Sequence, residues 1–144
     1  MVIPPQRTQM ESSVPHYYGN IVRQLFVIAA AVMSFTAPFY TNNLRIALPF
    51  VVLGALVLIA VAAFMNPRKK NVVIASAIAA GVGMLIYETW ALFDYKMSTW
   101  EEFILRQILA SVFMSAFYFS MKTLRAFVLG TIGKRAEAGE FDNQ

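Results

Sequence analysis

Two charged residues, Glu88 and Arg106, lie inside segments that are otherwise apolar. They are almost equidistant from a polar turn near Met97, so an antiparallel helix hairpin would bring them to the same depth. Each lies about six residues inside its expected helix end, roughly 9 Å along the axis. Charges at that depth in a membrane are costly unless they are paired or hydrated. We therefore predict an ion pair or polar site. The alternatives are that each side chain only reaches the membrane interface, or that the two serve in transport.

Small residues gather in the segment that contains Glu88. Ala75, Ala79 and Gly83 recur every four residues and share one helix face, and Ala77 and Gly81 form a second pair of this kind. Small residues let membrane helices approach one another closely. The pattern predicts a packing face, used either within the chain or toward another membrane protein or a second copy.

The residues that most catalytic and metal sites require are scarce. There is no cysteine, which excludes disulfides and thiolate sites, and His16 is the single histidine, so a histidine-rich metal site is not expected. His16 precedes the first apolar segment and is not placed to form a Ser-His-Asp set, and neither a phosphate-binding loop nor an HExxH motif occurs. We expect no catalytic residue, no cofactor and no metal, and therefore not an enzyme.

The elements that carry these residues are long apolar segments. Of the 144 residues, 58% are apolar and 14% charged, against about 25% charged in a soluble domain. About 20 apolar residues cross the hydrocarbon core as a helix. Four segments meet this length, and they comprise residues 21–39, 44–65, 72–93 and 100–121. With short polar turns between them, they predict an all-α, integral membrane four-helix bundle of up-down-up-down topology.

Shorter segments flank this single four-span domain of residues 21–132. Residues 1–20 form a polar leader, residues 122–132 a juxtamembrane extension of the last helix, and residues 133–144 a polar tail. Ser98 or Thr99, followed by acids in the next helical turn, is typical of a helix N-cap. No cleaved signal is expected, because the first apolar segment is long enough to span and no small-x-small site follows it.

The basic residues divide unequally between the two sides of the predicted membrane domain. Nine fall on the side of the termini, and they are Arg7, Arg23, Arg68, Lys69, Lys70, Lys122, Arg125, Lys134 and Arg135. Three fall on the other side, namely Arg45, Lys96 and Arg106. The positive-inside rule places both termini in the cytoplasm. The absence of cysteine and of glycosylation acceptors favours a bacterial inner membrane.

Two functions remain open at this stage. The first is a non-catalytic accessory, assembly or structural subunit that binds another membrane protein, or itself, through helix–helix contacts. The second is a small oligomeric channel or transporter that uses Glu88 and Arg106. Residues 68–70 together with Lys122 and Arg125 are candidates for contacts with anionic lipid. The lipid bilayer is the expected surrounding, and no nucleic-acid groove is expected because the basic residues alternate with apolar ones.

Overall fold

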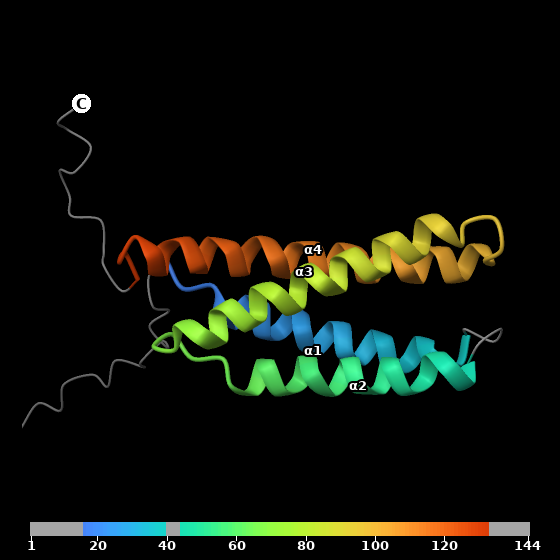
Figure 1. Cartoon of the computed structure of the whole chain (residues 1–144), viewed down its shortest axis with the longest axis horizontal. Helices are drawn as coiled ribbons and strands as arrows, with labels where there is room; N and C mark the ends of the chain where they lie inside the picture. Colours follow the sequence, from blue (N-terminus) through green and yellow to red (C-terminus); the bar gives the residue numbers. More distant parts are fainter. Residues whose placement is uncertain (1–15, 40–43, 133–144) are drawn as a thin grey trace, which may run out of the picture.

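The structure is a computed structural model that describes residues 16–39 and 44–132. For residues 44–47 it describes the backbone, and from Leu48 onward it describes the side chains as well. The described part is helical, without strands. Its helices, given in chain order, are α1 (Gly19–Thr36), the 3-10 turn η1 (Ala37–Phe39), α2 (Leu44–Ala63), α3 (Lys70–Phe93) and α4 (Trp100–Val128). The four α-helices lie side by side, and consecutive helices run in opposite directions (Figure 1).

The helix ends follow the predicted segments to within three residues, except at the end of α4. There the helix runs without a break through most of the predicted extension and stops at Val128. Gly130 ends it, with a φ of 64° that glycine adopts without a steric penalty. The Thr131 amide donates to the Ala126 carbonyl and the Gly130 amide to that of Phe127, which is a Schellman motif. The predicted leader up to residue 15 and the tail from residue 133 lie outside the described residues.

Three helical segments are long and apolar enough to cross a membrane: Gly19–Phe39, Lys70–Phe93 and Trp100–Val128. In α2, the apolar stretch with described side chains is the shorter one, Leu48–Ala63. The described chain therefore has four helices, three of which have the length and composition of a membrane span.

Packing between the helices is uneven. Helix α3 packs mainly against α4, and α1 packs against both α2 and α4, whereas α2 and α3 touch little. Figure 1 shows why: α3 starts beside the end of α2 and then crosses away from it toward α4. The buried core draws residues from all four α-helices, among them Phe26 of α1, Ala55 of α2, Ala80 of α3 and Leu109 of α4.

Candidate functional site

Arg106 is the most deeply buried charged residue of residues 16–39 and 48–132, with 4% of its surface exposed. Its Nη1 lies 3.2 Å from Oδ2 of Asp94, the residue at which α3 ends, and donates to Ser98 Oγ at 2.9 Å. Its guanidinium carbon lies 4.5 Å from the centre of the Trp90 ring. Trp90 in turn donates from Nε1 to the same Asp94 oxygen at 2.9 Å. The arginine is thus held by groups of α3 and of the turn that follows it.

Glu88 has a different partner from the one predicted. Its Oε2 accepts a hydrogen bond from Nε2 of Gln107 at 3.1 Å, while Arg106 forms its ion pair with Asp94. The predicted pairing of Glu88 with Arg106 is therefore replaced by two separate contacts across the same hairpin. A functional role for the two residues stays a prediction.

The direction of side chains on a helix explains the difference. Helical side chains lean toward the N-terminus of their own helix. Helix α4 begins at the turn, so Arg106 leans toward the turn and reaches Asp94 and Ser98. Helix α3 ends at the turn, so Glu88 leans away from it and meets Gln107. Because Glu88 and Arg106 are equally distant from the turn, their backbone atoms lie at similar depth, but their side chains point in opposite directions along the helix axes.

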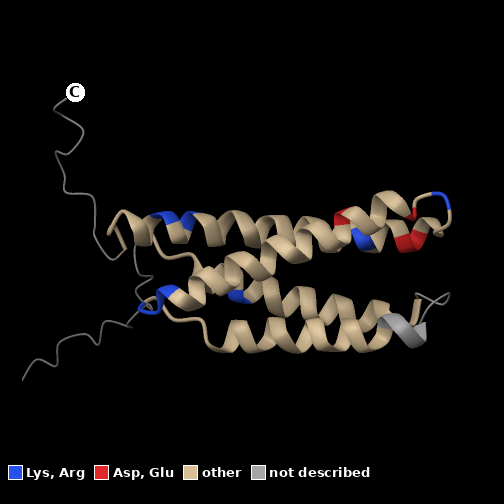
Figure 2. Ribbon diagram, viewed as in Figure 1, with Lys and Arg blue, Asp and Glu red and all other residues tan. Residues whose placement is uncertain are grey.

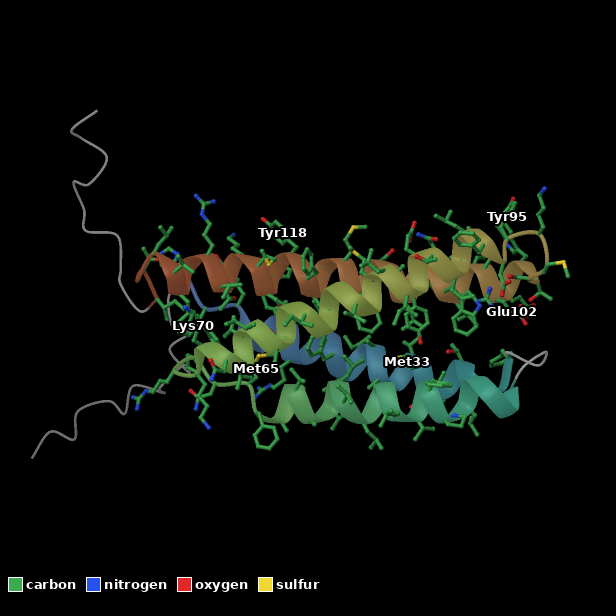
Figure 3. The ribbon with its side chains drawn as sticks, viewed as in Figure 1. Met33, Met65, Lys70, Tyr95, Glu102 and Tyr118 are labelled. Atoms are coloured by element: carbon green, nitrogen blue, oxygen red, sulfur yellow. The ribbon has the colours of Figure 1, made fainter. Side chains whose placement is uncertain are left out.

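The start of α4 completes this polar region. Thr99, one of the two residues predicted as the cap, accepts a hydrogen bond from the Glu102 amide at 3.4 Å, and Glu101 and Glu102 lie in the first turn. Glu102 is 9% exposed and lies at the same end of the molecule as Tyr95 (Figure 3). Sequence reasoning missed Asp94, Ser98 and Gln107 as partners, although the lean of long side chains toward a helix start would have pointed to Asp94.

The predicted packing face divides between two neighbours of α3. Gly83 lies against Phe113 of α4, since a methyl group there would come within 2.6 Å of its ring, and a methyl group on Gly81 would come within 3.2 Å of the Phe117 ring. Ala77 is buried as well. Ala79 lines an open groove, which Gly83 and Phe113 also border, and Ala75 is exposed. Most of the small residues therefore serve packing within the chain.

The groove lies between α2 and α3, where the two helices diverge, and has a volume of about 510 Å³. Small residues line part of it, among them Gly54 and Ala79, and Met33 of α1 reaches it from behind. Its sides carry exposed apolar residues, which are Phe50, Leu53, Val57, Val82 and Ile86. Figure 3 shows Met33 between α1 and α2. Polar groups are nearly absent from its lining, so the groove suits an apolar occupant.

The predicted lipid-contact residues lie at the opposite end of the helices from the Arg106 region. Residues 68–70, Lys122 and Arg125 are all exposed. Close by, burial raises the pKa of the Tyr17 hydroxyl above its usual 10.0, and the charge of Arg23 partly offsets this rise. Tyr17 therefore stays neutral at physiological pH.

What the site can do chemically is limited by what its polar groups already contact. In residues 16–39 and 44–132, no group of three histidine or acidic side chains is placed to hold a metal ion. Arg106, Asp94, Glu88 and Gln107 hydrogen-bond to one another or to their immediate neighbours. Compared with known protein families, curated proteins and solved structures, the chain matches none.

Proposed function

We propose that the chain is a non-catalytic subunit of a membrane protein complex and that it acts by binding a transmembrane helix. All four helices would cross the bilayer, in an up-down-up-down bundle. Helix α2 has 20 residues, which at about 1.5 Å per residue gives roughly 30 Å, the thickness of the hydrocarbon core. It also runs alongside three helices that have the length of a span (Figure 1).

The orientation of the proposed bundle follows from its basic residues. Nine basic residues lie on the side of the termini and three on the other side. By the positive-inside rule, both termini and residues 68–70 would lie in the cytoplasm, and the turn between α3 and α4 would lie outside. A bacterial inner membrane fits the lack of cysteine and of glycosylation acceptors. With this orientation, Glu88 and Arg106 lie toward the outer face.

The observation that carries the proposal is the groove between α2 and α3. A bilayer leaves no apolar space empty, so an acyl chain or a protein helix fills the groove. Gly54 and Ala79 line part of the groove with small side chains. Small residues of this kind allow a helix to approach closely. Bulky exposed residues on both sides, such as Phe50 and Ile86, would then pack against the flanks of that helix. A helix gains directional packing here that a lipid chain does not.

The polar residues support a subunit over a transporter. The charged side chains of α3 and α4 that lie within the predicted spans all sit at one end, and they are Glu88, Glu101, Glu102 and Arg106. Glu88 and Arg106, the two that lie deepest, contact protein groups. Farther along the α3–α4 interface, the polar contact is a hydrogen bond of 3.3 Å between Ser76 and Ser120, both buried. Such an arrangement holds helices together and offers little to a passing ion.

Co-purification from native membranes tests the proposal. The groove variant is Ala79→Leu, and its matched control is Ala75→Leu, one helical turn away on the exposed surface of α3. We expect the wild type and the control to retain one membrane protein in fixed ratio, identified by mass spectrometry, and the groove variant to lose it. Equal retention by both variants would contradict the groove as the binding site.

A flux assay on the purified chain in liposomes separates the subunit from the transporter. The subunit proposal expects no ion or solute flux with wild-type protein. Flux that disappears in a chain carrying both Glu88→Gln and Arg106→Met would establish transport instead. Recovery of a second copy in place of a foreign protein would make the contact homo-oligomeric.

A further inference from the structure

Among the described residues, the charged side chains at the end of the molecule opposite the Arg106 region are all basic. Six basic residues gather there, and they are Arg23, Arg68, Lys69, Lys70, Lys122 and Arg125. The acidic residues of the described chain all lie toward the other end, in or beside the connection between α3 and α4 (Figure 2). The charge distribution of the described helices is thus strongly polarised along their axes.

These six basic side chains are available to an outside partner. All six are exposed, and within the described residues the ion pair found is the one between Arg106 and Asp94 at the other end. Their charges come from three parts of the fold: the start of α1, the connection between α2 and α3, and the last turns of α4. A patch contributed by several elements at one end of the molecule fits an extended anionic surface better than a single small anion.

Two tyrosine rings hold the charged group of Lys122 in place. Lys122 Nζ lies 4.6 Å from the centre of the Tyr18 ring and 6.0 Å from that of Tyr118. The Tyr18 amide donates to Thr123 Oγ1 at 3.2 Å, which ties the chain before α1 to α4. Tyrosine rings favour the headgroup level of a bilayer. In a bilayer these contacts would hold Lys122 near the lipid phosphates. Figure 3 shows Tyr118 pointing away from the other helices.

We propose that this basic end binds the anionic phospholipid headgroups of one leaflet, with Lys122, Arg125 and residues 68–70 as the principal contacts. The inference rests on the proposed insertion of the chain in a membrane. The exposed surface of α4 next to the patch is largely apolar, with Met114 and Met121 exposed beside Lys122. In a membrane, Lys122 and Arg125 would therefore lie next to the hydrocarbon region. A lipid headgroup is anchored at that boundary, whereas a soluble polyanion is not. Each basic residue near such a surface strengthens the attraction about fivefold.

The test is a comparison of lipids bound to the purified full chain by native mass spectrometry. The protein in detergent is titrated with phosphatidylglycerol and, separately, with phosphatidylcholine, and inorganic phosphate serves as competitor. The variants are Lys122→Gln with Arg125→Gln at the basic end, and Lys96→Gln in the other turn as the matched control. Unchanged melting in lipid-free detergent shows that each variant folds.

We expect wild type to prefer phosphatidylglycerol, the control to keep this preference, and the double variant to lose it by about 25-fold. Higher ionic strength weakens the preference, because the patch is exposed. An unchanged preference in the double variant, an equal loss in Lys96→Gln, or displacement of the lipid by phosphate would each overturn the inference. Resistance of the chain to alkaline extraction from membranes tests insertion separately, so a chain that inserts without lipid preference refutes this inference alone.

Discussion

Helix α3 is packed closely on one side and hardly at all on another. Toward α4, its glycines lie directly against aromatic rings, and Tyr87 stacks on Phe113 with ring centres 5.7 Å apart. Toward α2, the same helix borders a groove of about 510 Å³. Without a hydrophobic driving force between membrane helices, close contact depends on shape. Small residues of α3 thus lie in two settings: Gly81 and Gly83 face aromatic rings of α4, and Gly83 and Ala79 also border the groove.

The close side should be the more sensitive to added volume. In Gly83→Ala the new methyl group would lie 2.6 Å from the ring of Phe113, which is 2% exposed and cannot move aside freely. We expect a loss of about 2 kcal/mol in the free energy of unfolding, seen as a lower melting temperature in detergent.

The matched control for this variant is Gly54→Ala on α2. There the methyl group would lie 3.1 Å from Cε of Met33, the mobile end of a flexible side chain, so the cost should stay below about 0.5 kcal/mol. Equal melting temperatures for the two variants would show that the contact of α3 with α4 is not specially close.

The polar end of the same interface should show the next largest effect. Arg106→Met removes the ion pair with Asp94 and the hydrogen bond to Ser98, and we expect a loss of about 1.5 kcal/mol. Glu88→Gln keeps an oxygen that can accept from Gln107 and should cost less than about 0.5 kcal/mol.

Chemical or thermal unfolding of the two single variants and their combination measures both costs. Since the two contacts are separate, the effects should add. If the cost of the double variant differed markedly from the sum of the two single costs, Glu88 and Arg106 would be coupled directly, as in the ion pair that the sequence predicts.

The open side should tolerate added volume best. Ala79→Leu places a larger side chain in the groove, where there is space for it, so its melting temperature should match that of the wild type closely. A loss as large as that of Gly83→Ala would mean that α2 closes on α3 in the membrane. In that case the groove would not be available to a partner.

The sequence alone predicts the helices well because their signals are local. The length of apolar segments, the cap at Thr99 and the acids after it specify where α4 begins. The division of small residues between Gly83 and Ala79 is not predictable in this way, because it depends on how α3 is tilted between its neighbours. The pairing of Arg106 with Asp94 also depends on the direction in which the side chain points. The equal spacing of Glu88 and Arg106 from the turn gives no information on that direction.

The most direct test of the central claim is photo-crosslinking inside native membranes. A benzoylphenylalanine replaces Val82 beside the groove or, as control, the exposed Met114 on α4. We expect one protein adduct of fixed mass at position 82, identical to the co-purified partner, and none at position 114. Adducts with lipid only at position 82, or the same adducts at both positions, would contradict the proposal that the groove binds a transmembrane helix.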